Sequence, residues 1–200
     1  KVFESGNTAI KIFNGLDFND FFIETEIENR NSTTIMMLYH DSPAKGCKEG
    51  LTALRIIKER IKGLKVILYG VPKKPKKLED WIEYHRMPSR EKLRNLYNQS
   101  AIFLSPSHSE GWGLPVAEAM QCGCMVVTSD IEGFNDFVKN KDTGICFKVK
   151  DVNDMIEKLL IAINNKALRI SIAQQGNVYI KNFTWDIALN KMVTLLNELK

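Results

Sequence analysis

Short apolar runs that alternate with longer helical stretches constrain the fold of this chain most strongly. Apolar runs bounded by polar residues or glycine predict buried strands at residues 35–39, 65–69, 101–105, 125–128 and 145–147, with a weaker candidate at 81–85. The stretches between and after them predict helices at residues 50–61, 89–99, 115–121, 151–163 and 186–199. Single helices between strands imply right-handed βαβ crossovers, so the expected fold class is α/β, a Rossmann-like parallel sheet flanked by helices.

The bulk composition is that of an ordinary globular chain. Of the 200 residues, 44% are apolar and 26% are charged, which suits a packed core and argues against disorder. The formal net charge of +4 suits a phosphate-bearing ligand or an anionic membrane surface, and it is too small to indicate nucleic-acid binding. The sequence has no membrane-spanning run and no signal-peptide pattern, so we expect a cytoplasmic protein. Because the chain begins with Lys1 rather than methionine, we expect a portion upstream of it.

The four cysteines, Cys47, Cys122, Cys124 and Cys146, match no zinc-binding pattern. Cys122 and Cys124 are too close in sequence for a usual intrachain disulfide, and we expect all four to be reduced thiols. No Asp-x-Asp motif follows a strand, and no cluster of His, Cys or Asp has metal-ligand spacing. We therefore expect no metal and no cofactor.

The segment that follows the strand expected at 101–105 has the features of a phosphate-binding loop. Gly111 and Gly113 lack side chains, so a ligand can approach the backbone amides closely. Pro115 is expected at the first helical position, where its missing N–H costs nothing. A helix N-terminus has unpaired amides and a partial positive charge, and parallel sheets bind ligands at the carboxyl ends of their strands. The loop therefore predicts an anion site.

Two acids flank this loop. Glu110 precedes the glycines, and Glu118 lies about one turn inside the expected helix. Carboxylates accept hydrogen bonds from sugar hydroxyls, so a diphosphate between the two acids would place one sugar ring toward each. The alternative is that Glu118 only complements the helix dipole and that Glu110 is solvated.

The run from Ser109 through Glu110-Gly111-Trp112-Gly113-Leu114-Pro115 to Glu118-Ala119-Met120 resembles the Glu-x7-Glu signature of the retaining GT-B glycosyltransferases called group 1 or family 4. Three further motifs resemble the family in the correct order: Asn14-Gly15-Leu16-Asp17 at the start of its C-terminal domain, Ala44-Lys45-Gly46 after the first strand, and Phe183-Thr184-Trp185 before the last helix. The resemblance covers nearly the whole chain. It implies that residues 1–200 are the C-terminal, nucleotide-sugar-binding half of a GT-B fold.

The resemblance implies a role for each matching residue. Glu118 would bind the ribose hydroxyls of the nucleotide, while Glu110 would contact the transferred sugar and stabilise an oxocarbenium-like transition state. Lys45 and the amides around Gly113 and Leu114 would hold the diphosphate, because a cation offsets the charge that develops on the leaving group. Gly111 and Trp112 belong to the same donor-binding loop. For Lys45, an exposed loop lysine without a special role is the alternative.

His40 is a departure from the family, which usually has arginine five residues before the lysine. Histidine is the weaker cation at neutral pH, so either His40 protonates against the diphosphate, another residue substitutes, or donor binding is weak. Asp136 stands where the family commonly has glutamate, which leaves the acceptor chemistry intact.

Three more residues are candidates for donor contacts. Arg86 and Met87 follow the strand expected at 81–85, where the resemblance places the nucleobase, although Arg86 is equally compatible with a solvated surface position. His108 either reaches the sugar phosphate or is a loop histidine without a special role.

A GT-B enzyme has its active site in the cleft between two Rossmann-like domains, so the resemblance implies a missing N-terminal domain that carries the acceptor site. Residues 1–30 would form the interdomain segment, and the helix within 183–200 would pack on the absent domain, with its apolar face exposed or repacked here. We expect the isolated chain to bind nucleotide weakly and to transfer no sugar. The expected partners are a nucleotide-diphosphate sugar and an acceptor glycan or lipid-linked glycan, without nucleic acid. The lysine-rich loop 72–77 is either solvated or in peripheral contact with the inner face of a membrane.

Two other functions remain open at this point. A nucleotide-sugar epimerase resembling GT-B would use the same diphosphate site without an acceptor. A non-catalytic Rossmann-like partner of a transferase would have no reason to keep two acids beside a phosphate-binding helix. A dinucleotide-dependent oxidoreductase is disfavoured, because no Gly-x-Gly-x-x-Gly follows a strand.

Overall fold

The computed structural model describes residues 10–198, and its centre is a parallel sheet of six strands. The strands are β1 (Thr34–Leu38), β2 (Lys65–Gly70), β3 (Ile82–Arg86), β4 (Ile102–Ser105), β5 (Met125–Ser129) and β6 (Ile145–Phe147). Their order in the sheet is β3-β2-β1-β4-β5-β6, and every neighbouring pair is parallel. The predicted Rossmann-like parallel sheet is confirmed. The strand order reverses between β1 and β4, which is where such sheets bind ligands.

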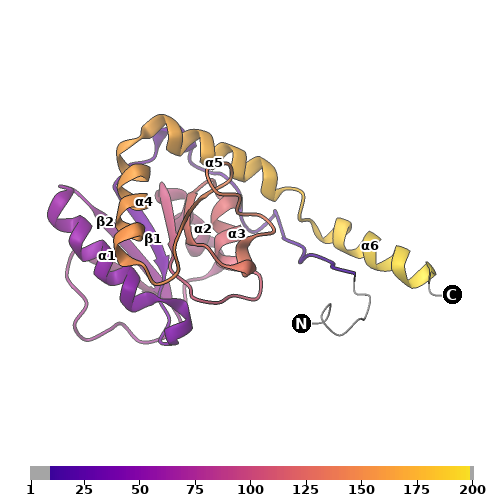
Figure 1. Cartoon of the computed structure of the whole chain (residues 1–200), viewed down its shortest axis with the longest axis horizontal. Helices are drawn as coiled ribbons and strands as arrows, with labels where there is room; N and C mark the ends of the chain where they lie inside the picture. Colours follow the sequence, from indigo (N-terminus) through magenta and orange to yellow (C-terminus); the bar gives the residue numbers. More distant parts are fainter. Residues whose placement is uncertain (1–9, 199–200) are drawn as a thin grey trace.

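Helices cover both faces of the sheet (Figure 1). They are α1 (Cys47–Arg60), α2 (Arg90–Gln99), α3 (Leu114–Gln121), α4 (Val152–Asn164), α5 (Lys166–Ile180) and α6 (Trp185–Glu198). Helices α1 and α4 pack on one face and on each other, while α2 and α3 pack on the opposite face. Helix α5 runs beside α3 and β5 at the edge of this arrangement (Figure 1).

Side chains of each central strand alternate between the two faces of the sheet. In β1, Ile35 and Met37 belong to the core beneath α1 and α4, whereas Met36 belongs to the core beneath α2 and α3. All three are fully buried. A sheet covered on both faces needs apolar residues at successive positions, which explains why these strands are continuous apolar runs in the sequence.

The residues just before the helices fix where each helix begins. Ser89 accepts a hydrogen bond from the amide of Lys92 at the start of α2, as its sequence position predicts. Helix α1 begins at Cys47 and not at residue 50, because Gly46 with its φ of 61° turns the chain directly into the helix. Helix α5 was not predicted; it follows α4 after the single cap residue Asn165, which accepts from the amide of Leu168 at 3.0 Å.

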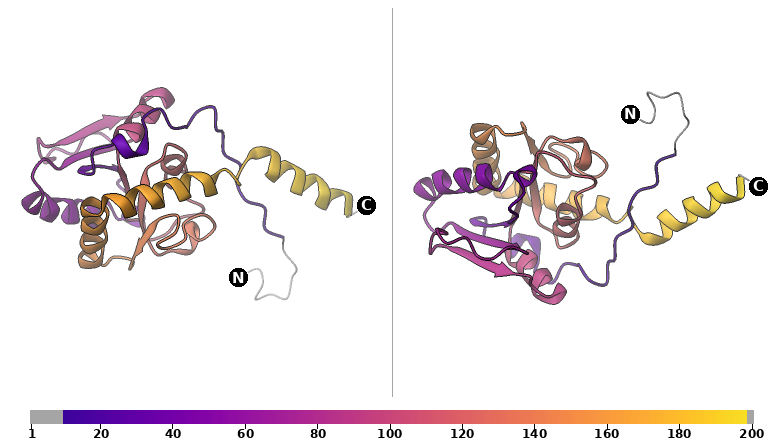
Figure 2. Two further views of the ribbon diagram at one scale, coloured as in Figure 1. Left: turned by 90° about the horizontal axis from the view of Figure 1, so that it is seen from above. Right: turned by 90° about the horizontal axis from the view of Figure 1, so that it is seen from below.

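Helix α6 projects away from the sheet (Figures 1 and 2). None of its described side chains is buried. Its large apolar residues are about half exposed: Trp185, Ile187, Leu189, Met192, Val193 and Leu196. The apolar face that was expected to be unusual is therefore exposed, while its packing on another domain stays a prediction.

Arg30 anchors the segment that precedes β1. Its side chain is only 6% exposed and donates hydrogen bonds to five different oxygen atoms. These are the carbonyl oxygens of Thr25, Tyr97, Ser100 and Cys122, and Oδ1 of Asn98. No carboxylate lies among these acceptors, so the guanidinium acts through backbone carbonyls and joins the N-terminal segment to α2 and the α3–β5 turn.

Candidate functional site

The loops that follow β1 and β4 meet at the point where the strand order reverses. The amide of His108 donates to the carbonyl of Ala44 at 2.7 Å, which joins the two loops directly. A Cβ atom at Gly46 would lie 2.0 Å from the carbonyl oxygen of Pro106. Only glycine therefore permits this approach, and it brings Lys45 beside the residues that follow β4.

Lys45 and Glu110 form an ion pair at this junction. The ammonium Nζ lies 2.7 Å from Oε1 and 2.8 Å from Oε2 of Glu110, and the two side chains are 26% and 12% exposed. Ser107 donates its hydroxyl to Oε1 of the same carboxylate at 2.8 Å. Lys45 is thus paired and only partly exposed, and Glu110 is not a solvated acid, while the roles of both residues in donor binding stay predictions.

Helix α3 begins beside this pair and has no side-chain cap. It starts at Leu114, one residue earlier than predicted, which places Pro115 second. Gly113 precedes the helix with a φ of 88°, and a Cβ atom there would lie 2.4 Å from the ring of Phe134. The conformation and the crowding both require glycine. Pro115 has no N–H, and the amides of Val116 and Ala117 donate to the carbonyl of Gly113 at 3.0 and 3.2 Å, so the amides of Gly113 and Leu114 are those left for a ligand. The partial positive charge of the helix N-terminus favours an anion there.

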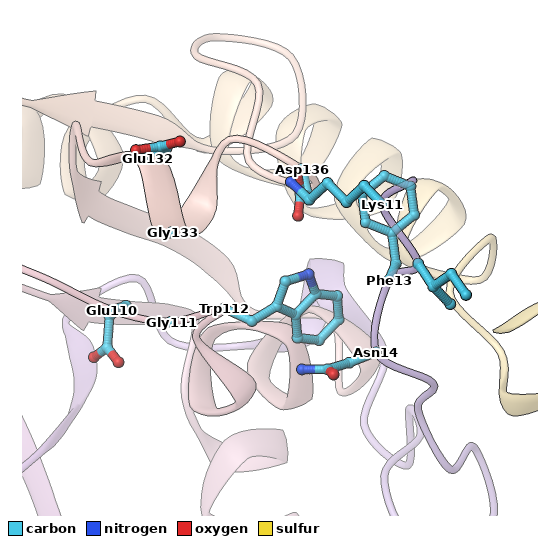
Figure 3. A pocket seen from close by; sticks show the side chains of 10 residues that line it. Lys11, Phe13, Asn14, Glu110, Gly111, Trp112, Glu132, Gly133 and Asp136 are labelled. Carbon is cyan, nitrogen blue, oxygen red and sulfur yellow. Dashed lines mark hydrogen bonds and ion pairs between the residues drawn. The ribbon is translucent and has the colours of Figure 1, made fainter. Parts of the chain in front are cut away.

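A hollow of about 500 Å³ opens beside Glu110 (Figure 3). It is lined by residues from the N-terminal segment and from the loops after β4 and β5: Lys11, Ile12, Phe13, Asn14, Glu110, Gly111, Trp112, Glu132, Gly133 and Asp136. The Trp112 ring lies between Asp136 and Asn14 in Figure 3 and packs against Phe137, with ring centroids 4.8 Å apart. Lys11 bridges this hollow through an ion pair with Asp136 at 2.5 Å. Asp136, which stands where the family commonly has glutamate, therefore forms an ion pair with Lys11.

Gly133 allows the loop after β5 to lie against Glu110. A Cβ atom at Gly133 would approach the carbonyl oxygen of Glu110 to 2.4 Å. The short helix that contains this glycine, Glu132–Phe134, therefore positions the backbone of the acid.

Glu118 lines a different hollow, together with Arg90 and Leu93 of α2, Leu114 and Gln121 of α3, and Trp185. The hydroxyl of Tyr97 donates to Oε2 of Glu118 at 3.1 Å. Burial raises the pKa of Glu118 to about 7, against the opposing effects of the Tyr97 hydrogen bond and the positive charge of Arg90. Trp112 and Leu114 flank the N-terminus of α3 and line one hollow each, so the two acids face separate spaces at this terminus.

His40 and His108 come together in a third hollow, at the start of α1. The ring Nδ1 of His40 accepts from the amide of Ser42 at 2.9 Å, which leaves Nε2 for another partner. Nε2 of His108 lies 3.7 Å from a carboxylate oxygen of Glu49. Neither the Lys45 ammonium nor the Glu110 carboxylate lines this hollow.

Arg86 and Met87 lie at the carboxyl end of β3, at the edge of the sheet, and both are exposed. Nε of Arg86 donates to the carbonyl of Val71 at 3.1 Å, and the amide of Met87 donates to the carbonyl of Gly70 at 2.8 Å. Met87 has a φ of 46° and is 64% exposed. These contacts join the loops after β2 and β3, while neither residue lines the hollow of Glu110 or that of Glu118.

The structure also bears on the cysteines and on ion binding. All four cysteines are free thiols in the structure, three of them buried and Cys146 partly buried. Within residues 10–198, no group of three or more His, Cys, Asp and Glu side chains is arranged to hold a metal ion. In the same part of the chain, no helix is both long enough and apolar enough to cross a bilayer.

Sequence reasoning missed Ser107, Tyr97 and Lys11, which contact Glu110, Glu118 and Asp136. A serine three residues before the acid was a local signal for the first of these contacts. The other two contacts join residues that are far apart in the sequence, and no local pattern marks them.

The fold and the site define a doubly wound α/β domain, with a cation, an acid and an uncapped helix at the point where the strand order reverses. The chain belongs to the glycosyl transferases group 1 family, whose model matches residues 19–178.

The chain is 27% identical over 188 residues to an uncharacterized glycosyltransferase of Methanocaldococcus jannaschii, a match that covers 90% of this chain and 51% of the relative. Among solved structures, HepE of Anabaena in complex with UDP and glucose superposes with a TM-score of 0.79 at 18% identity, over 96% of this chain and 59% of HepE. The C-terminal domain of the group 1 protein LpcC of Francisella tularensis superposes with a TM-score of 0.71 at 20% identity, over 84% of this chain and 97% of that domain. The chain therefore spans about half the length of the full relatives that it matches.

Proposed function

We propose that this chain provides the donor-binding site of a glycosyltransferase that transfers a sugar from a nucleotide-diphosphate sugar to an acceptor with retention of configuration. The observation that carries the proposal is the Lys45–Glu110 pair beside the uncapped N-terminus of α3, at the switch point of the sheet. Membership of the group 1 family supports transferase chemistry. The complex of HepE with UDP and glucose supports a nucleotide-sugar donor.

Each residue of the site has a distinct role in this proposal. The diphosphate lies against the amides of Gly113 and Leu114 and the Lys45 ammonium, because both supply positive charge where negative charge develops on the leaving group. Glu118 accepts hydrogen bonds from the ribose hydroxyls in its own hollow. Glu110 faces the transferred sugar, and its negative charge stabilises the positive charge that develops on the sugar ring. Protein cations and amides thereby do the work that a metal would otherwise do.

The nucleobase is proposed to rest near Arg86 and Met87, and His108 and His40 are proposed to flank the phosphates. The two histidines line a hollow of their own at the start of α1. His40 contributes through its remaining ring nitrogen, Nε2.

We also propose that residues 1–200 form the C-terminal domain of a longer GT-B protein, with residues 1–30 as the interdomain segment and residues 183–200 as a helix that packs on the N-terminal domain. Two observations support this assignment. The exposed apolar side chains of α6 lack any cover within the described part of the chain, and the C-terminal domain of LpcC superposes over nearly its whole length. In this proposal the acceptor, a glycan or a lipid-linked glycan, binds mostly to the N-terminal domain, and the protein is cytoplasmic, with peripheral contact at the inner face of the membrane.

Calorimetric titration of this chain with UDP, GDP and ADP tests the donor site. We expect one nucleotide to bind saturably and to lose its binding in Glu118→Ala. The failure of all three nucleotides to bind at millimolar concentration, both here and in the two-domain protein, would contradict the proposal. Product analysis separates transfer from epimerisation, because an epimerase changes the donor sugar without any acceptor. Sugar transfer by the 200-residue chain alone would contradict the two-domain assignment.

A further inference from the structure

A chain of hydrogen bonds runs from the sheet to the hollow that Glu118 lines, and its members are Tyr69, Tyr97 and Glu118. The two phenolic oxygens lie 2.7 Å apart, and the Tyr97 hydroxyl lies 3.1 Å from Oε2 of Glu118. Tyr97 is fully buried, and Tyr69 is 6% exposed. The chain thus connects a core residue of β2, through α2, to the acid that the proposed function assigns to the ribose.

The direction of these hydrogen bonds follows from the donors that are available. An ionised Glu118 can only accept, so Tyr97 donates to it. Tyr97 has a single hydroxyl proton, and the bond between the tyrosines therefore has Tyr69 as its donor. The carbonyl oxygen of Pro115 lies 3.3 Å from the Tyr97 hydroxyl and offers a second acceptor when Glu118 is protonated.

Packing fixes the position of the Tyr97 hydroxyl. The ring makes edge-on contacts with Phe21, Tyr69 and Phe103, at centroid distances of 5.8, 5.9 and 5.6 Å. Aromatic contacts on several sides leave the ring one orientation in the core. The hydroxyl is therefore a preset donor for one carboxylate oxygen of Glu118.

We propose that Tyr97 is a positioning residue of the donor site, which holds the Glu118 carboxylate in the orientation and charge state that ribose hydroxyls require, with Tyr69 supporting it from behind. The proposal rests on the proposed function for its ligand. The geometry of the chain is independent of that function.

The surroundings of Glu118 explain why its charge state needs support. The titratable groups that act on it are Tyr97, Tyr69, Cys122, Arg90 and Asp20, and Asp17 lines the same hollow. Burial raises the pKa of Glu118 to about 7, whereas the Tyr97 hydrogen bond and Arg90 lower it. About half of the Glu118 side chains are then ionised at pH 7, so a change in this single hydrogen bond alters the population that can bind a donor.

Removing the hydroxyl in Tyr97→Phe is expected to raise the pKa of Glu118. A hydrogen bond to a charged group supports about a tenfold change in acid strength, which lowers the ionised population at pH 7 from about one half to about one tenth. Nucleotide affinity is expected to fall about fivefold at pH 7, and most of this loss is expected to be recovered at pH 9. Tyr69→Phe is expected to act in the same direction with a smaller effect, because Tyr97 still donates to Glu118.

The experiment is a calorimetric titration with UDP, GDP and ADP between pH 6 and pH 9, on the wild type, Tyr97→Phe, Tyr69→Phe and the control Ser100→Ala. Ser100 is a buried hydroxyl at the end of the same helix, where it donates to the carbonyl of Leu96 at 2.9 Å without contacting Glu118. Nucleotide binding that is unchanged in Tyr97→Phe at every pH would overturn the proposal. So would a loss of the same size in the control variant, because such a loss reports general damage to the core.

An NMR titration of the carboxyl carbon of Glu118 in the ligand-free protein separates this proposal from the proposed function. A higher pKa in Tyr97→Phe than in the wild type supports the positioning role even when no nucleotide binds. An unchanged pKa together with unchanged binding overturns it while leaving the donor site in place. If the wild type binds no nucleotide while the pKa rises in Tyr97→Phe, the proposed ligand fails and the hydrogen-bond chain stands.

Discussion

Replacing Glu118 with glutamine is expected to stabilise the fold at alkaline pH while it removes the proposed ribose contact. Burial raises the pKa of Glu118 to about 7 in the folded protein, against an ordinary value of 4.5. Between these two values the folded protein keeps a proton that the unfolded chain has lost, so stability falls as the pH rises through this window. The difference between these two pKa values lowers the free energy of unfolding by about 3 kcal/mol above pH 7. Glutamine avoids this cost, and its side-chain carbonyl can still accept from Tyr97.

Urea unfolding of both proteins at pH 5 and pH 8.5 measures this effect. The gain in free energy of unfolding on Glu118→Gln is expected to be about 1 kcal/mol or less at pH 5 and about 3 kcal/mol at pH 8.5. The pH 5 measurement is the internal control, because Glu118 is protonated there in the folded state and resembles the amide. A gain that is equal at both pH values would refute the reasoning, since it would come from packing and not from the buried charge.

Three further substitutions test other parts of the structure. Lys45→Ala is expected to lower sugar transfer by the two-domain protein by about 100-fold or more, measured with labelled donor, because it removes the cation from the leaving diphosphate; transfer at the wild-type rate would contradict that role. Arg30→Met is expected to lower the free energy of unfolding by about 3–5 kcal/mol, because buried carbonyl groups lose their donor. A loss below about 1 kcal/mol in urea unfolding would show that Arg30 does not anchor the N-terminal segment. Gly113→Ala is expected to lower the free energy of unfolding by about 2–4 kcal/mol, against about 1 kcal/mol for Gly63→Ala. Both glycines have a positive φ, and only Gly113 is crowded. Equal urea midpoints for the two variants would show that the crowding is unimportant.

The sheet was predictable because it is buried on both faces. Strands such as β1 and β2 are continuous apolar runs, and glycine or polar residues mark their ends. Helix α5 was not predictable in this way. Its buried positions include Arg169 and Asn177, which bond to carbonyls of α4 and of α3, and these polar residues interrupt the apolar period.

The residue types of the site were predictable, and their arrangement was not. The acids and the glycine-rich turn are contiguous in sequence, so local chemistry points to them. The contact between Lys45 and Glu110 joins residues 65 positions apart and depends on two close backbone approaches, at Gly46 and Gly133. The hydrogen bond from Tyr97 to Glu118 likewise depends on how α2 packs against α3. A sequence pattern carries no information on such approaches until the fold is known.

The ion pair between Lys45 and Glu110 constrains how a diphosphate can be held. An ammonium has three donors, and the two oxygens of Glu110 accept two of them in the described structure. In the proposed donor complex, one donor of Lys45 is therefore left for a phosphate oxygen while the carboxylate stays in place beside the sugar. The pair has no net charge, so in this proposal the amides of Gly113 and Leu114 and the positive end of α3 supply much of the positive potential for the diphosphate. Glycine at the cap of α3, which its φ of 88° and the Phe134 ring require, also adds no side chain that would occupy those amides.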